Sequence, residues 1–204
     1  PSGRPNFNLP MLRDFHMWQA EIERVFKPRE DCPKYLVLGS LFPGIFNLGG
    51  DLEHFSACIL AADREKLLDY GRSCVRLLYR NMHSLNLPMV TIALVQGDAL
   101  GGGFEAVLAF NVVVAERGAR FGLPETAFGL FPGMGAHCFL SRKIGLAETE
   151  RMILEGRIYS AEDMYEMGLV HVLAEPGEGQ AAVADYIAQN RRRQPSHRNV
   201  YAAS

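Results

Sequence analysis

The sequence lacks a long hydrophobic run, a strong charge of one sign and a paired-cysteine motif. Its 204 residues carry a formal net charge of −2, which gives little reason to expect a nucleic-acid partner. No apolar stretch approaches the roughly 18–20 residues that a membrane-spanning helix needs. The four cysteines (Cys32, Cys58, Cys74 and Cys138) are far apart, and the last three lie in apolar helical contexts that predict core packing. We therefore expect a cytoplasmic protein.

Several catalytic classes are also disfavoured by what is missing. The six histidines show no metal-ligand spacing, so we expect no metal and no cofactor, and His137 is expected to be structural. Ser40 and Ser141 lack the G-x-S-x-G turn of a serine hydrolase. No Gly-Lys-Ser/Thr follows the glycine-rich stretch near residue 100, which excludes a Walker phosphate loop.

Apolar residues, which make up 48% of the chain, alternate between helical and extended patterns. The patterns predict helices over 11–27, 52–83 (in two pieces divided near 61–63), 104–110, 136–144, 147–155, 160–167 and 179–193. They predict strands over 34–40, 89–97, 111–116 and 168–175, the second of them buried on both faces. Strands alternating with helices indicate an α/β fold with mostly parallel strands. The basic run 191–193 is expected to be a solvated helix end.

The stretch VQGDALGGGFE (95–105) allows three interpretations. The pattern Gly101-x-Gly103-x-x-Ala106, with Glu116 ending the next strand, matches a loose dinucleotide-binding fingerprint. Three features argue against this interpretation. Glu116 follows the first glycine too closely in the sequence, the helix between them is short, and Glu105 would repel a pyrophosphate. A second interpretation is that the glycines only allow a helix and a strand to pack closely.

The third interpretation is catalysis by backbone amides. A helix that begins at glycines presents unpaired N–H groups to a carbonyl oxygen and can bind the oxyanion that develops there. FNLGGDL (46–52) is a second glycine turn before a helix, with Asp51 suited to cap that helix. Glu105 and Glu125 could then supply acid–base chemistry, because carboxyls in an apolar pocket have raised or split pKa values.

Four segments in series resemble the crotonase (enoyl-CoA hydratase/isomerase) superfamily. They are FNLGGDL, VQGDALGGGFE, FGLPETAFGLFPGMGA (121–136) and GRIYSAEDMYEMGLVHVL (156–173). The resemblance implies a spiral of ββα units with peripheral helices, usually assembled as homo-oligomers, most often trimers. It implies an oxyanion hole at Gly102 and at Gly50 or Gly49. It also implies that Glu105 and Glu125 are the catalytic pair that adds or removes water across C2–C3 of an acyl thioester.

Other segments resemble the diffusible signal factor synthases within that superfamily. These are RPNFNLPMLRDFHMWQ (4–19), PGIFNLGGDL (43–52), LFPGMGAHCFLSRKIG (130–145) and RNVYAA (198–203). This branch dehydrates 3-hydroxyacyl thioesters of acyl carrier protein and releases a cis-2-unsaturated fatty acid, a quorum-sensing signal. The resemblance thus implies a dehydratase with thioesterase activity, and it leaves open which glutamate is the acid. The alternatives are an enoyl-CoA hydratase/isomerase that takes a CoA thioester and a non-catalytic acyl-binding homologue.

Met134 matches an acyl-pocket position of that branch. The expected apolar neighbours of the substrate are Leu48, Leu100, Phe104, Phe128, Leu130 and Phe131. From the resemblance, we expect residues 1–204 to form a single crotonase-like domain without an N-terminal strand and the C-terminal helices that the superfamily usually has.

Overall fold

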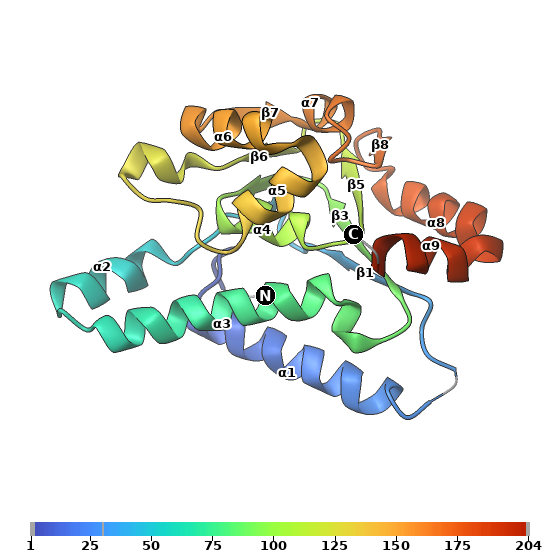
Figure 1. Cartoon of the computed structure of the whole chain (residues 1–204), viewed down its shortest axis with the longest axis horizontal. Helices are drawn as coiled ribbons and strands as arrows, with labels where there is room; N and C mark the ends of the chain where they lie inside the picture. Colours follow the sequence, from blue (N-terminus) through green and yellow to red (C-terminus); the bar gives the residue numbers. More distant parts are fainter. Residues whose placement is uncertain (1–2, 30, 203–204) are drawn as a thin grey trace.

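The strands form two four-stranded sheets that the chain enters alternately (Figure 1). The computed structural model describes residues 3–29 and 31–202. The first sheet has the order β1-β3-β5-β8 and is parallel throughout; its strands are β1 (Tyr35–Gly39), β3 (Val90–Val95), β5 (Val112–Glu116) and β8 (Val172–Ala174). The second has the order β2-β4-β6-β7 and is antiparallel only at its last pair; its strands are β2 (Ile45–Asn47), β4 (Asp98–Leu100), β6 (Arg120–Gly122) and β7 (Ile158–Ser160).

Each turn of the chain gives one strand to each sheet and then a helix, which is the expected spiral of ββα units. The units are β1-β2-α2, β3-β4-α4 and β5-β6-α5. The α-helices are α1 (Leu9–Phe26), α2 (Leu52–Leu60), α3 (Arg64–Met82), α4 (Gly102–Leu108), α5 (Ala136–Ile144), α6 (Leu146–Glu155), α7 (Ala161–Glu166), α8 (Gly179–Asn190) and α9 (Gln194–Ala202). Short 3-10 turns are η1 (Ser84–Asn86), η2 (Pro124–Phe128) and η3 (Arg191–Arg193), the last exposed as expected. Ala203, the last residue of RNVYAA, lies outside the described residues.

The predicted strand 89–97 is confirmed as β3, and a short strand that was not predicted, β4, follows it in the other sheet. β3 ends at Val95, β4 begins at Asp98, and Gly97 lies at the crossing between them. A Cβ atom on Gly97 would lie only 2.0 Å from the backbone of Gly44, so the chain can cross here only without a side chain. The three-residue strands β2, β4, β6 and β7 were not predicted because such short segments carry no usable periodicity. The predicted division of residues 52–83 is confirmed, since Asp63 caps the start of α3.

The core lies on both faces of the first sheet. All residues of β3 and β5 are buried, as predicted for the first of these strands. Alternate side chains such as Ile92 pack toward Val183 of α8, while Ala93 and its neighbours pack toward α4. Each fully buried aliphatic side chain contributes about 1.5–3 kcal/mol, so this double-sided burial fixes the position of α4 and its glycines.

Outside the sheets, α1 and α3 run side by side, and α2 projects with the start of α3 as an arm (Figure 1). The cysteines are free; Cys32, Cys58 and Cys74 are buried. Cys138 is exposed, so its predicted place in the core was wrong: it lies on the outer face of α5, whereas Ala136 and Leu140 face inward. No helix among the described residues is both long enough and apolar enough to cross a bilayer.

Candidate active site

Two glycine turns meet where β2 and β4 end. The strands are parallel neighbours, so the chain leaves both at the same edge of the sheet. A Cβ atom built on Gly49 would lie 2.8 Å from the Gly102 nitrogen, and one built on Gly102 would lie 3.6 Å from the Gly50 nitrogen. The backbones of the two turns are therefore in contact, as a shared oxyanion site requires.

The amides of Gly50 and Gly102 are the pair available to a ligand. The Gly49 N–H donates to Asn47 Oδ1 at 2.7 Å, and the Gly101 N–H donates to a carbonyl of β6 at 2.8 Å. Within 3–29 and 31–202, neither the Gly50 nor the Gly102 N–H has an acceptor. Gly102 begins α4, where an N–H has no partner inside the helix. Of the two amides expected as donors in the turn at residues 46–52, that of Gly50 is therefore available to a ligand, whereas that of Gly49 is not.

The three consecutive glycines make three different close contacts. Gly101 has a φ of +54°, and a Cβ atom there would lie 2.8 Å from Glu125 Oε1. A Cβ atom on Gly102 would lie 2.6 Å from Met134 Sδ, and one on Gly103 would lie 2.0 Å from the carbonyl oxygen of the last residue of β2. The glycines therefore let α4 lie against both the turn at residues 46–52 and the side chain of Glu125. The close-packing and the oxyanion interpretations of this stretch are thus compatible.

Glu105 lies in the first turn of α4 and is only 1% exposed. Its Oε1 atom accepts the N–H groups of Met134 at 2.8 Å and Ala136 at 2.9 Å. Burial raises the pKa of Glu105 to about 7; the backbone hydrogen bonds oppose this rise, and the nearby charge of Glu125 adds to it. A carboxyl with this pKa can accept or donate a proton near neutrality.

Glu125 lies in η2, directly after Pro124, on the loop between β6 and α5. Burial also raises the pKa of Glu125. Its Oε2 atom is shielded from solvent and has no hydrogen-bond partner among the described residues. An unpaired buried carboxylate oxygen is costly, and such groups occur mainly where a ligand or a reaction uses them.

Both acids line one cavity of about 390 Å³, between the α2–α3 arm, α4 and the loop after β6. Five of the predicted substrate neighbours also line it: Leu48, Phe128, Leu130, Phe131 and Met134. Phe128 and Phe131 remain 67% and 62% exposed, which places them at the mouth. The cavity is thus a largely apolar space with two carboxyls and two free amides at one end.

Two predicted substrate neighbours do not line this cavity. Phe104 is 1% exposed and packs against Phe121, with ring centroids 5.6 Å apart, in the core beneath α4. Leu100 is in β4, outside the cavity lining. Sequence proximity to the glycines suggested both residues, but the first turn of α4 directs neighbouring side chains to opposite sides.

The α2–α3 arm supplies cavity residues that were not predicted. The side chains at 52, 55 and 59 of α2 and at 67, 70 and 74 of α3 line the same space. Their i, i+3, i+7 spacing is that of an apolar helix face, which does not by itself distinguish a core from a cavity. Burial raises the pKa of the Cys74 thiol to about 11, so this cysteine is a poor nucleophile at neutral pH.

Tyr70 fixes the first glycine turn. Its hydroxyl accepts the Asp51 N–H at 2.9 Å and donates to the Phe7 carbonyl at 2.8 Å. Asp51 in turn caps α2 by accepting the His54 N–H at 3.2 Å, as predicted. The buried tyrosine therefore holds the backbone immediately after Gly50.

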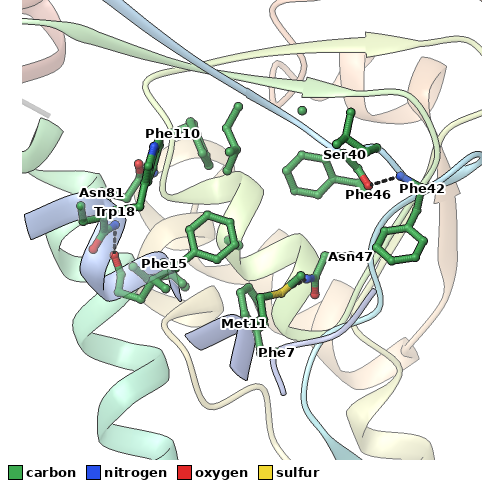
Figure 2. A pocket seen from close by; sticks show the side chains of 17 residues that line it. Phe7, Met11, Phe15, Trp18, Ser40, Phe42, Phe46, Asn47, Asn81 and Phe110 are labelled. Carbon is green, nitrogen blue, oxygen red and sulfur yellow. Dashed lines mark hydrogen bonds between the residues drawn. The ribbon is translucent and has the colours of Figure 1, made fainter. Parts of the chain in front are cut away.

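A second cavity, of about 210 Å³, lies on the other side of α4 (Figure 2). Phe7, Met11, Phe15 and Trp18 form one side of it, from the N-terminal segment and α1. Its lining contains no titratable side chain. It therefore offers apolar volume but no acid–base chemistry, and we place the candidate active site in the cavity that holds the two glutamates.

Residues considered for other functions, such as nucleotide binding or serine hydrolysis, make structural contacts instead. Glu116 accepts hydrogen bonds from Gln96 Nε2 at 2.8 Å and from the Gly179 N–H at 2.9 Å, so it ties β5 to the start of α8 rather than facing a nucleotide. Ser141 donates to a backbone carbonyl at 2.6 Å, and Ser40 accepts a backbone N–H at 3.1 Å. Among the described residues there is no cluster of three histidine, cysteine, aspartate or glutamate side chains that could hold a metal ion.

Comparisons with known proteins identify the family and the fold. The sequence profile of the enoyl-CoA hydratase/isomerase family matches residues 17–189. The chain is 30% identical to "Probable enoyl-CoA hydratase 2, mitochondrial" from Arabidopsis thaliana over 96% of its own length and 61% of the relative. It is 34% identical to "Methylglutaconyl-CoA hydratase, mitochondrial" from Mus musculus over 72% and 45%. The solved structure of Pseudomonas aeruginosa DspI superimposes with a TM-score of 0.82 at 27% identity, covering 98% of this chain and 78% of that one.

The chain therefore belongs to the enoyl-CoA hydratase/isomerase family and has the crotonase-like fold expected from its motifs. It spans about half to three-fifths of the length of these two curated relatives.

Proposed function

We propose that the protein dehydrates a 3-hydroxyacyl thioester of acyl carrier protein and then hydrolyses the thioester, releasing a cis-2-unsaturated fatty acid signal. The observation that carries this proposal is the meeting of two unpaired amides, the buried Glu105 and the half-buried Glu125 in one apolar cavity. The choice of the signal-producing branch is supported by the motifs at 4–19, 43–52 and 130–145.

In the dehydration, the thioester oxygen accepts hydrogen bonds from the amides of Gly50 and Gly102. One glutamate takes the proton from C2, and the other gives a proton to the departing 3-hydroxyl group. A C2–C3 double bond forms, and water leaves. Each amide of an oxyanion site is worth about 2.7–4 kcal/mol in comparable enzymes, and each general acid or base about two to four powers of ten in rate.

In the hydrolysis, water adds to the thioester carbonyl carbon, and the same two amides stabilise the tetrahedral oxyanion. One carboxylate takes the proton of the attacking water. The carbon–sulfur bond then breaks, the thiol leaves with a proton, and the free acid remains. No further cofactor is needed to balance either step.

The second candidate function is the hydration or isomerisation of an enoyl-CoA, favoured by the names of the curated relatives. The third is acyl binding without turnover. Purified protein should be given the same 3-hydroxyacyl group on carrier protein and on CoA, and the products identified by mass spectrometry. Free cis-2-enoic acid from the carrier substrate supports the proposal. Reversible hydration of trans-2-enoyl-CoA alone favours the second function, and binding without products the third.

The glutamine variants Glu105→Gln and Glu125→Gln each test the role of one acid. Each should slow dehydration by about two to four powers of ten. Glu166→Gln, at an exposed position of α7, is the matched control and should keep the wild-type rate. If either active-site variant retains the wild-type rate, that acid has no part in proton transfer. We also propose a homo-oligomer, most simply a trimer, which light scattering of the purified protein measures directly.

A further inference from the structure

The outer face of α3 carries an apolar stripe that no described element covers. Tyr70, Cys74, Leu77 and Leu78 form the buried face of this helix. On the opposite side, three large side chains at i, i+7 and i+11 are exposed: Leu68 (40%), Val75 (45%) and Tyr79 (59%). They lie along a shallow groove of about 770 Å³. The helix thus buries one apolar face in the core and exposes a second apolar row to solvent.

Arginines flank this row. Arg64, Arg72 and Arg76 line the same groove. Arg72 is paired only with Asp69, at 3.5 Å, where both side chains are well exposed, so the pair contributes little. Within the described part of the chain, neither Arg64 nor Arg76 has an ion-pair partner. The whole of α3 carries five basic and two acidic side chains. A positive, partly apolar surface of this kind complements an acidic partner.

The groove is continuous with the mouth of the candidate active site. Leu67 and Gly71 line both the groove and the cavity that holds the two glutamates. Gly71 is in the interior of α3, where glycine costs about 1 kcal/mol relative to alanine. A Cβ atom there would meet nothing within 4 Å, so close packing does not explain this glycine. Its lack of a side chain instead leaves the passage between groove and cavity open.

We infer that the outer face of α3 is the docking surface for an acidic acyl carrier protein, whose flexible thioester arm passes over Gly71 into the cavity. This inference rests on the proposed function. The span from Arg64 to Arg76 is twelve residues of helix, about 18 Å, which suits contact with a protein helix. A CoA nucleotide would need a compact set of cations and would leave the row from Leu68 to Tyr79 unused.

The test compares one 3-hydroxyacyl group on three carriers: acyl carrier protein, CoA and pantetheine. The double variant Arg64→Glu/Arg76→Glu should lower kcat/KM for the carrier-protein substrate by about tenfold or more, mainly through KM. The pantetheine ester, which has no protein or nucleotide, should be turned over within about twofold of wild type. Arg192→Glu/Arg193→Glu, at the exposed η3 turn, is the matched control and should change none of the three.

Three results overturn the inference. No loss with the carrier-protein substrate means that α3 is not the docking surface. An equal loss with CoA and carrier protein assigns the arginines to a phosphate group instead. An equal loss with pantetheine means that they act on the site itself. Turnover of the pantetheine ester by wild type reports the proposed chemistry separately, and calorimetric binding of holo-carrier protein tests the docking even if that turnover is absent.

The passage over Gly71 has its own test. Gly71→Leu should lower kcat for the carrier-protein and pantetheine substrates by about tenfold or more and leave the affinity for holo-carrier protein unchanged. Gly71→Ala is the matched small substitution; it should raise the Tm and keep most of the turnover. Equal turnover by both variants would show that the arm takes another route.

Discussion

Replacing Glu105 by glutamine should make the protein more stable at neutral pH while it abolishes most of the activity. The ordinary pKa of a glutamate is 4.5, and burial raises that of Glu105 to about 7. Because the unfolded chain ionises at the lower pH, the folded state becomes progressively less favourable as pH rises through this interval. At about 1.4 kcal/mol per pH unit, the interval corresponds to about 3 kcal/mol. A glutamine carries no charge to bury and keeps an oxygen that can accept the amides of Met134 and Ala136.

The expected result is a difference between two stability curves. Below pH 4.5 the free energies of unfolding of Glu105→Gln and wild type should be similar. The variant should then gain up to about 3 kcal/mol between pH 4.5 and 7, with no further gain above. Urea titrations followed by circular dichroism measure this, with Glu166→Gln as a surface control that should follow the wild-type curve. A difference that does not change with pH, or a variant that is less stable at pH 8, would refute the reasoning.

Three further predictions follow from particular contacts. Tyr70→Phe removes the hydroxyl that bridges the Phe7 carbonyl and the amide after Gly50. The variant should lose about 1–3 kcal/mol of unfolding free energy, and its kcat should fall by more than its KM changes. An unchanged kcat would contradict a positioning role. Gly103→Ala places a Cβ atom 2.0 Å from a backbone oxygen and should destabilise the fold by about 3 kcal/mol or more in thermal unfolding, a prediction that fails if its Tm matches that of wild type. Phe104→Ala should cost about 3–5 kcal/mol of stability without changing the preference for acyl chain length. Phe131→Ala should change that preference with little loss of stability. Measuring stability and chain-length preference for both variants tests this, and the opposite pattern would contradict the placement of the two residues.

The sequence was sufficient to predict the main features of the fold. Long apolar runs, such as the one that became β3, and strongly periodic helices, such as α3, carry clear signals. The strands β2, β6 and β7 have three residues each, which is too short for any period to be seen. The switch of sheets at Gly97 depends on close contact with Gly44, a residue more than fifty positions away. Such contacts cannot be seen in a local pattern.

The candidate site's residues could be named from the sequence, but their arrangement could not. The two glycine turns and the two acids could be named because their residue types and order are informative. The choice of Gly50 over Gly49 required the side chain of Asn47, which occupies one of the two amides. Phe104 was misplaced because a residue beside the glycines of the candidate site can face either the cavity or the core. The contribution of the α2–α3 arm was missed because an apolar helix face looks the same whether it covers a core or a substrate.

The most direct test of the central claim is a crystal structure of the double variant Glu105→Gln/Glu125→Gln with a bound 3-hydroxyacyl pantetheine thioester. We predict that the carbonyl oxygen lies about 2.7–3.1 Å from the amide nitrogens of both Gly50 and Gly102, with C2 and C3 between residues 105 and 125. A carbonyl bonded to neither amide, or an acyl group bound in the apolar cavity behind α4 with its thioester away from the glycines, would contradict the account.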